Sequence, residues 1–318
     1  MKFAKMHGLG NDYIYVDVAR ERVDDPAALA RAVSDRQRGI GADGLILIGP
    51  STGAGVDVSM RIFNADGSEA QMCGNGIRCV AKYAIDRGLS TSNPLRVATR
   101  RGILSMLWTN GEDGKVASVE VDMGAPIFAL GKIPAEIPGL GDRDEVIARP
   151  FTRADWADAL SGGATARSAC SLEWIDRSGL SPSISLASMG NPNAVFWARD
   201  VDAVPLEAAG SAIERHNFFP ERINVHFVEA ISRDEVRVRT WERGSGATMA
   251  CGTGACAVCA AGVREARTDR RITAQLTGGE LEVAWLDAHA SVLMRGPATH
   301  VFDGKWPLEV RVATGVRS

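Results

Sequence analysis

The sequence lacks the long apolar runs, the strong charge excess and the dense cysteines that mark several classes of protein. None of its apolar stretches approaches the roughly 18 residues that a membrane-spanning helix needs. Residues 1–7 show no apolar core of a signal peptide. The formal net charge is only −3, which argues against a surface that holds nucleic acid. We therefore expect a cytoplasmic protein without a membrane or nucleic-acid partner.

Six cysteines in 318 residues do not make a disulfide framework. Cys251, Cys256 and Cys259 have the spacing C-x4-C-x2-C, which also occurs in plant-type iron–sulfur ligation. No later cysteine could supply a fourth ligand, and the alanines around them indicate the interior of a helix. We interpret Cys79, Cys256 and Cys259 as buried packing residues. We expect no metal site and no cofactor, since no motif that anchors pyridoxal phosphate is evident.

One short motif is present twice, 178 positions apart. Cys73-Gly74-Asn75-Gly76 and Cys251-Gly252-Thr253-Gly254 each place a cysteine and Gly-X-Gly before a run that predicts a helix. Backbone N–H groups at such a helix N-terminus can surround a small anion. The helix dipole is expected to lower the pKa of the cysteine. The repeat predicts a duplicated fold with one reactive thiol in each half.

The pattern of short apolar runs predicts an α+β protein, long enough for two domains of about 150 residues each. In the first half we expect strands at 13–18, 44–48, 56–63, 95–98, 103–107 and 116–121, and helices at 26–35 and 77–87. Between 128 and 185 only a short helix at 152–160 is expected. The second half then repeats the order, with strands at 194–198, 224–229, 235–240, 271–276, 281–285 and 290–295, and helices at 205–216 and 255–263.

Further segments accompany the two cysteine motifs, namely His7–Asp12, Asn64–Ser68, Met189–Pro192, Arg222–Val225, Glu242–Ala255 and residues 296–304. With them the chain resembles the diaminopimelate epimerase family over nearly its whole length. The resemblance implies two similar pseudo-symmetric domains, each a sheet wrapped around a central helix, with the active site in the cleft between them. We expect an N-terminal domain of residues 1–122, to which 301–318 return, and a C-terminal domain of residues 123–300.

The resemblance also implies an isomerase that converts L,L- to meso-diaminopimelate in lysine biosynthesis without a cofactor. Inverting an α-carbon needs a base on one face and an acid on the other, and a tuned thiol titrates near neutral pH. By resemblance Cys73 and Cys251 are this base and acid, and Glu242 binds the reacting amino group or poises a thiol. By the same resemblance Arg243, Asn64, Asn191 and Asn224 hold the far end of the substrate, Asn11 lines the site, and Gly74, Asn75, Gly252 and Thr253 stabilise the charge that develops at its carboxylate.

Two positions depart from the family's usual pattern. Asn193 stands where a His usually follows Gly-Asn-Pro, and Ala247 stands where a Glu is usual. Two alternatives therefore stay open: a cofactor-independent racemase of the same fold for a different amino acid, and a thiol-redox protein in which Cys73 and Cys251 form a disulfide switch. The expected partner is a small-molecule amino acid substrate. Formation of a homodimer is left open.

Overall fold

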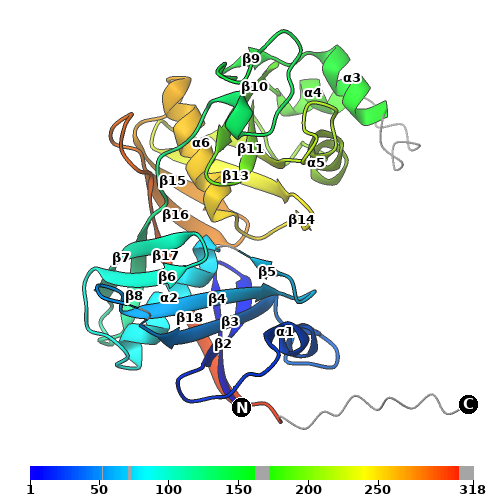
Figure 1. Cartoon of the computed structure of the whole chain (residues 1–318). Helices are drawn as coiled ribbons and strands as arrows, with labels where there is room; N and C mark the ends of the chain where they lie inside the picture. Colours follow the sequence, from blue (N-terminus) through cyan, green and yellow to red (C-terminus); the bar gives the residue numbers. More distant parts are fainter. Residues whose placement is uncertain (52, 71–72, 162–171, 308–318) are drawn as a thin grey trace, which may run out of the picture.

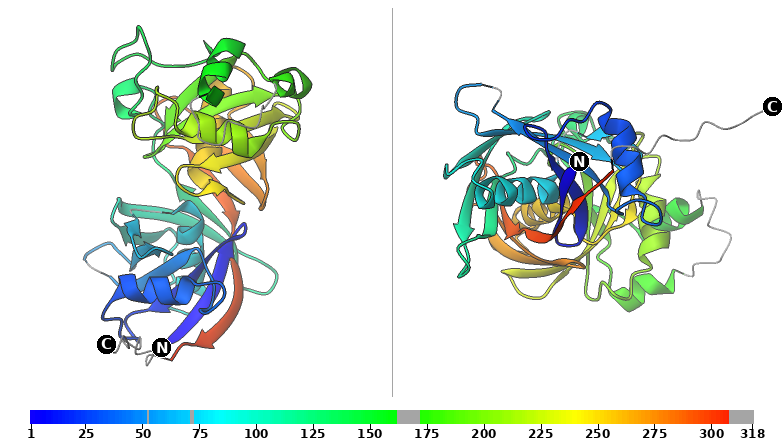
Figure 2. Two further views of the ribbon diagram at one scale, coloured as in Figure 1. Left: turned by 90° about the vertical axis from the view of Figure 1, so that its right-hand side faces the viewer. Right: turned by 90° about the horizontal axis from the view of Figure 1, so that it is seen from below.

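The computed structural model describes residues 1–51, 53–70, 73–161 and 172–307 and shows two stacked lobes (Figures 1 and 2). The lower lobe of Figure 1 contains helices α1 (Pro26–Ser34) and α2 (Gly74–Asp86). Its strands are β1 (Lys2–Gly8), β2 (Asn11–Asp17), β3 (Gly44–Pro50), β4 (Val58–Asn64), β5 (Glu69–Ala70), β6 (Leu95–Thr99), β7 (Gly102–Asn110), β8 (Val116–Asp122) and β18 (Thr299–Lys305).

The upper lobe contains helices α3 (Arg153–Ser161), α4 (Glu173–Ser178), α5 (Leu206–Glu214) and α6 (Gly252–Arg264), and a short 3₁₀ turn at Leu130–Lys132. Its strands are β9 (Arg149–Pro150), β10 (Ser183–Ser188), β11 (Pro192–Ala198), β12 (Asn224–Ala230), β13 (Glu235–Glu242), β14 (Gly246–Ala247), β15 (Arg271–Leu276), β16 (Gly279–Ala284) and β17 (Leu293–Pro297). Many strands and few helices confirm the predicted α+β class.

The two lobes repeat one strand topology. The lower lobe has the order β18-β1-β2-β3-β4-β6-β7-β8, and the upper lobe has β9-β10-β11-β12-β13-β15-β16-β17. The parallel pairs β2–β3 and β4–β6 correspond to the parallel pairs β11–β12 and β13–β15. We call α2 and α6, which begin directly after the two motif cysteines, the thiol helices. In the sequence, each thiol helix comes between the two strands of the second parallel pair of its lobe. Residues at equivalent places in the two lobes can therefore be compared directly.

The lobes also exchange their terminal strands. After β8 the chain crosses upward and adds β9 beside β10, and after β17 it crosses back and adds β18 beside β1. Strands β8 and β17 pair with each other where the lobes meet. The residue boundary of the domains, placed at 122 and 123 from the sequence, stays a prediction. Of the returning tail 301–318, residues up to Lys305 belong to β18, and 308–318 lie outside the described residues.

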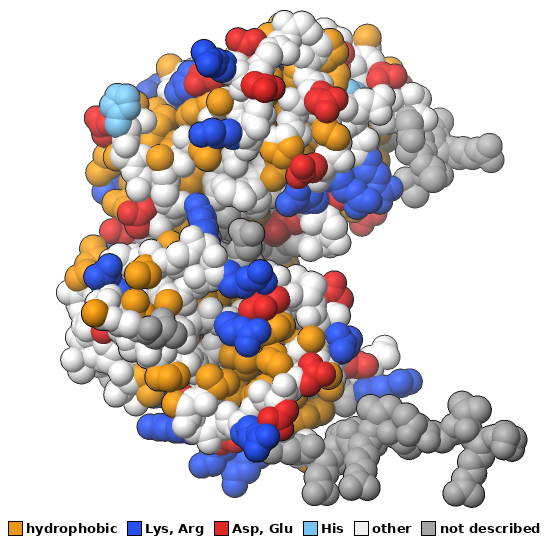
Figure 3. Space-filling model, viewed as in Figure 1, with side chains coloured by type: hydrophobic (Ala, Val, Ile, Leu, Met, Phe, Trp, Pro, Cys, Tyr) orange, Lys and Arg blue, Asp and Glu red, His pale blue; other side chains and the backbone are white. Residues whose placement is uncertain are grey.

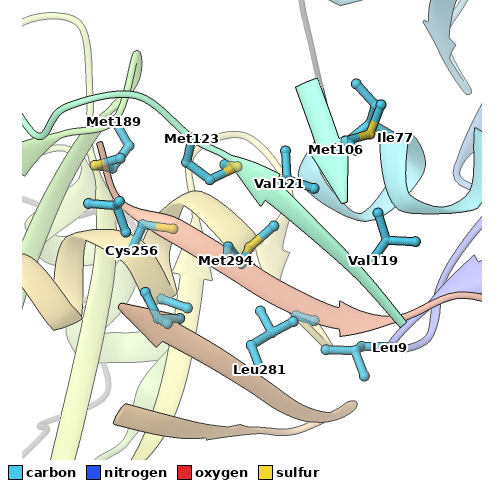
Figure 4. Close-up of a cluster of buried hydrophobic side chains, with 14 of the residues drawn as sticks. Leu9, Ile77, Met106, Val119, Val121, Met123, Met189, Cys256, Leu281 and Met294 are labelled. Carbon is cyan, nitrogen blue, oxygen red and sulfur yellow. The ribbon is translucent and has the colours of Figure 1, made fainter. Parts of the chain in front are cut away.

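A common hydrophobic core joins the lobes (Figure 4). Met123 and Val121 from the lower lobe lie near Met189 and Cys256 from the upper lobe, with Met294 of β17 among them. Both thiol helices are buried along most of their length. A separate core in the upper lobe packs Trp156, Trp174, Phe196 and other aromatic side chains around α3 and β11. The shared core fixes one helix N-terminus against the other.

Several expectations about single elements were incomplete. The strands β1, β10 and β18 were not predicted, because their short apolar runs are interrupted by Gly, Ser or charged residues. Helices α2 and α6 begin three residues before the predicted positions, at Gly74 and Gly252. The Gly-X-Gly sequence was placed before each helix, but it forms the first helical turn. The helix predicted at 152–160 is α3, where the Thr152 hydroxyl accepts from the Asp155 N–H at 3.4 Å.

Candidate active site

The two thiol helices meet end to end at their N-termini. Cys73 and Cys251 are the N-cap residues of α2 and α6. A methyl group added to Gly252 would lie 3.8 Å from the Cα of Gly74 and 3.0 Å from the sulfur of Met294. Across the junction, Nδ2 of Asn75 donates to the carbonyl of Ala250 at 2.9 Å. The positive ends of both helix dipoles therefore converge on one small region.

This region opens into a cavity of about 980 Å³ between the lobes. Figure 3 shows the surface hollowed there, on the side where β5 and β14 lie in Figure 1. Its volume suits a small-molecule site. The cavity is lined by both thiols and Glu242, and by eight of the nine residues expected to contact substrate: Asn11, Asn64, Gly74, Asn75, Asn191, Arg243, Gly252 and Thr253.

Asn224 is the predicted binding residue that does not line the cavity. It is buried behind the cavity wall, where its Nδ2 donates to Oδ1 of Asn193 at 3.2 Å. Its Oδ1 accepts from the backbone N–H of Arg243 at 2.9 Å. Asn224 thus fixes the chain that carries Arg243, whose exposed guanidinium donates to the carbonyl of Glu221 at 3.0 Å. We assign Asn224 a positioning role instead of direct substrate contact.

Cys73 lies among four hydrogen-bonding groups, one of which is the backbone N–H of Asn75. Its thiol donates to Oδ1 of Asn11 at 3.4 Å, and its sulfur accepts from the N–H of Gly76 at 3.4 Å. The Tyr13 hydroxyl also bonds to the sulfur. Burial raises the pKa of Tyr13 well above its usual value, so the phenol stays protonated and donates. Burial likewise raises the pKa of Cys73, and the Gly76 and Tyr13 donors oppose that rise.

Cys251 forms a coupled pair with Glu242. Its thiol donates to the carboxylate, which also accepts from the Thr248 hydroxyl at 2.5 Å. Burial raises the pKa of Glu242 above its ordinary value. Burial, and then the charge of Glu242, raise the pKa of Cys251 well above that of a free thiol. Two negative charges this close are unfavourable, so the pair retains one proton in the ligand-free protein.

The expectation that the helix N-termini lower the pKa of both cysteines is therefore wrong for the ligand-free protein. Removal from water disfavours the thiolate more strongly than the helix N-terminus and its N–H groups favour it. Burial therefore favours the neutral form of each thiol in the ligand-free protein, and a positive charge beside the sulfur would favour the thiolate. The ammonium group of an amino acid carries such a charge.

Other cavity residues were not identified from the sequence. Asp43 accepts from Nδ2 of Asn11 at 2.6 Å and so orients the amide beside Cys73. Arg36 donates to Asp43 at 2.8 Å and lines the same wall. Tyr13 could have been found, because it follows Asn11 by two positions and strand residues two apart share a face. Asp43 and Arg36 lie in loops whose approach to Asn11 depends on the folded sheet.

The three other described cysteines do not line the cavity. Cys79 is inside α2, and Cys256 and Cys259 are inside α6, all fully buried. Burial raises the pKa of Cys79 to about 11 and that of Cys259 to about 12, as expected for packing residues. Cys170 lies outside the described residues. Across the described ranges, no three His, Cys, Asp or Glu side chains group as a metal site, and no helix is long and apolar enough to cross a membrane.

Comparison with known proteins adds to this geometry. The chain matches the diaminopimelate epimerase family over residues 3–129 and 185–301. It is 45% identical to the diaminopimelate epimerase of Acetivibrio thermocellus, covering 96% of this chain and 98% of that protein. It is 46% identical to the diaminopimelate epimerase of Agathobacter rectalis, with 96% and 99% covered.

Solved structures share the fold at low identity. A phenazine biosynthesis protein of Bacillus anthracis matches with a TM-score of 0.61 at 15% identity, covering 96% of this chain and 98% of that one. A hydroxyproline epimerase of Agrobacterium vitis matches with a TM-score of 0.58 at 14% identity, with 96% and 90% covered. These likenesses concern the fold alone. The match over most of the sequence shows that this chain belongs to the diaminopimelate epimerase family.

Proposed function

We propose that this protein inverts an α-carbon of L,L-diaminopimelate to give the meso isomer, in the cytoplasm and as a step of lysine biosynthesis. One observation carries the proposal: two thiols, one from each lobe, line a single cavity at abutting helix N-termini. Both thiols come from one chain. The thiols supply the base and the acid, and the N–H groups of the two helix N-termini take the place of an electron-withdrawing cofactor such as pyridoxal phosphate by stabilising the charge that develops.

The helix N-termini hold the α-carboxylate of the substrate. Loss of the α-proton moves negative charge onto this carboxylate, and the converging N–H groups stabilise that charge as it forms. One thiolate removes the proton from one face, and the thiol opposite donates a proton to the other face. In the reverse direction the two exchange roles.

Glu242 allows Cys251 to ionise to a thiolate when substrate is bound. In the free protein it shares a proton with that thiol. When the substrate ammonium enters, its positive charge favours ionisation of this pair. Glu242 then takes the proton of Cys251, so that Cys251 becomes the thiolate beside the α-carbon while the pair still carries a single negative charge.

Arg243 selects the substrate. It lies on the cavity wall, exposed and fixed through its backbone by Asn224. A forked guanidinium suits a carboxylate, and diaminopimelate carries a second carboxylate at its far end. The second candidate is a racemase for another amino acid, which Asn193 and Ala247 favour because they replace the family's usual His and Glu beside the thiols.

The experiment that tests the proposal follows α-proton exchange in deuterated water over a panel of L-amino acids and L,L-diaminopimelate. We expect fastest exchange with L,L-diaminopimelate. Arg243→Lys keeps the charge but loses the fork, so kcat/KM for this substrate should fall by roughly tenfold to a hundredfold, as for one charge-assisted contact. Little loss is expected on a substrate with a single carboxylate.

The matched control is Cys79→Ala, which removes a buried thiol from α2 outside the cavity and should leave exchange unchanged. Faster exchange of a monocarboxylic amino acid by the unmodified protein would establish the second candidate. Equal losses of Arg243→Lys on both kinds of substrate would remove Arg243 from substrate selection.

A further inference from the structure

A buried polar pair behind the second thiol has an apolar counterpart in the other lobe. His226 of β12 and Thr240 of β13 face each other in register, as Ile46 of β3 and Ile62 of β4 do in the lower lobe. All four side chains are buried. The lower lobe shows that two isoleucines are enough to pack this site. A buried polar pair in the same place is unfavourable unless its hydrogen bonds are made.

His226 and Ile46 also occupy equivalent positions against the helices that follow Cys251 and Cys73. A methyl group added to Gly254 of α6 would lie 2.1 Å from Cε1 of His226. One added to Gly76 of α2 would lie 2.7 Å from Cδ1 of Ile46. Each of these two side chains thus packs against the first turn of the helix that follows a reactive cysteine. Only the one behind Cys251 is polar.

The orientation of the Asn193 side-chain amide determines which ring nitrogen of His226 carries the proton. Nδ2 of Asn193 faces the carbonyl of Asn191 at 2.7 Å and the carbonyl of Ala187 at 3.3 Å, and carbonyls only accept. Its Oδ1 must then be the atom that faces Nε2 of His226 at 3.1 Å, so Nε2 carries the proton. Nδ1 of His226 accepts from the Thr240 hydroxyl at 2.9 Å. Burial lowers the pKa of His226 to about 3, so the ring is neutral.

The same chain of bonds continues to the sulfur. Nδ2 of Asn193 also lies 3.4 Å from Oδ1 of Asn191, which leaves the Asn191 amide nitrogen facing the Thr253 hydroxyl oxygen at 3.1 Å. That hydroxyl lies 3.5 Å from Sγ of Cys251. A thiolate can only accept. When Cys251 is ionised, the Thr253 hydroxyl therefore accepts from Asn191 and donates to the sulfur.

We propose that His226 and Thr240, acting through Asn193 and Asn191, position the Thr253 hydroxyl as a hydrogen-bond donor to the Cys251 thiolate. The lower lobe has no need of such a chain, because Tyr13 occupies the place of Asn193 and bonds to Cys73 itself. This chain of hydrogen bonds supplies Cys251 with a donor, as Tyr13 supplies one to Cys73. The proposal rests on the proposed function only in taking Cys251 as a reacting thiol.

The test measures the alkylation rate of each thiol by iodoacetamide at one fixed pH, with the modified cysteine identified by mass spectrometry. The main variant is the double substitution His226→Ile with Thr240→Ile, which copies the apolar pair of the lower lobe. Besides Thr253, the groups that act on the Cys251 sulfur are Glu242 of β13, Cys73 of α2 and the Gly254 N–H, and the variant substitutes none of them.

Loss of this hydrogen bond to the thiolate should raise the pKa of Cys251 by roughly half to one unit. The fraction of thiolate falls accordingly, and the greater nucleophilicity of a more basic thiolate offsets part of the loss. We expect alkylation of Cys251 to slow by about twofold to fivefold, while the rate at Cys73 stays the same. The control Ile46→Val, at the equivalent place in the lower lobe, should change neither rate.

A Cys251 rate equal to that of the unmodified protein would overturn the proposal, as would an equal fall at both thiols. If the double variant does not fold, Thr253→Val removes the last donor directly and must slow Cys251 alone, whereas Thr253→Ser must restore the rate. Because alkylation needs no substrate, failure of this proposal can be told apart from failure of the proposed reaction.

Discussion

At the scale of single residues, the reactive thiols are distinguished by their partners more than by their place on a helix. Both are N-caps, and burial raises the pKa of both. Cys73 is bonded to a phenol that stays protonated, and Cys251 to a carboxylate that competes for its proton. The two-cysteine motif predicted the pair from the sequence. The direction of the pKa shift could not be predicted, because it depends on how completely the lobes enclose each sulfur.

Glu242 should set the acidic limit of activity. It can take the proton of Cys251 only when ionised, and burial raises its pKa above 4.5, so kcat/KM should fall as pH drops through that raised value. Thr248→Val removes a donor that favours the carboxylate, and should move this limb to higher pH by about half to one unit. Glu242→Gln should lower kcat/KM by roughly a hundredfold or more.

The measurement is the pH profile of kcat/KM for the three proteins. A limb that stays in place in Thr248→Val would assign the acidic limit to a different group. A limb that persists unchanged in Glu242→Gln would do the same, and would leave Glu242 as a residue that binds substrate only.

At the scale of elements, the glycines of the two motifs serve the contact between helix and strand. The third residue of each thiol helix packs on a central strand, and a side chain there would meet Ile46 in the lower lobe and His226 in the upper one. The sequence predicted these glycines as a site for an anion. It did not show their packing role, because the strands β3 and β12 that they contact lie far away in the sequence.

Substituting alanine for Gly254 and for Gly76 should lower the free energy of unfolding by different amounts. Both substitutions gain the same helix propensity. At Gly254 the new methyl would lie 2.1 Å from a rigid imidazole ring, and at Gly76 2.7 Å from the end of a flexible isoleucine. We expect Gly254→Ala to lower the free energy of unfolding by about 1–3 kcal/mol more than Gly76→Ala. Urea denaturation of both variants checks this. Equal midpoints would mean that the strand behind α6 can shift to make room.

At the scale of the whole molecule, the shared core and the exchanged strands make one unit of two lobes. The duplication was predicted from two four-residue motifs and a repeated order of elements. The return of the C-terminal segment to the lower lobe was expected from the family resemblance, but the pairings of β18 with β1 and of β9 with β10 were not, because pairing between strands distant in the sequence leaves no local pattern in either strand. The same reason explains why Asp43 and Arg36 were missed at the cavity wall, whereas Tyr13 could have been found from strand periodicity.

A single unfolding transition should result. Tryptophan emission, to which Trp108 of the lower lobe and Trp156, Trp174 and Trp197 of the upper lobe contribute, should change at the same urea concentration as far-UV circular dichroism, which also reports both lobes. Met294→Ala empties a fully buried site that touches both Gly74 and Gly252 and should cost about 2–5 kcal/mol. Both signals should shift together. A shift in one signal alone would show lobes that unfold independently.

The central claim is that two opposed thiols, one from each lobe, act as base and acid. The most direct test follows deuterium during early conversion of L,L-diaminopimelate in deuterated water. We predict that the meso product carries one solvent deuterium at the inverted carbon, while recovered substrate carries almost none, because one group removes the proton and another replaces it. A product that retains the hydrogen of the substrate, or equal deuterium in substrate and product, would mean that one group serves both faces and would contradict the account.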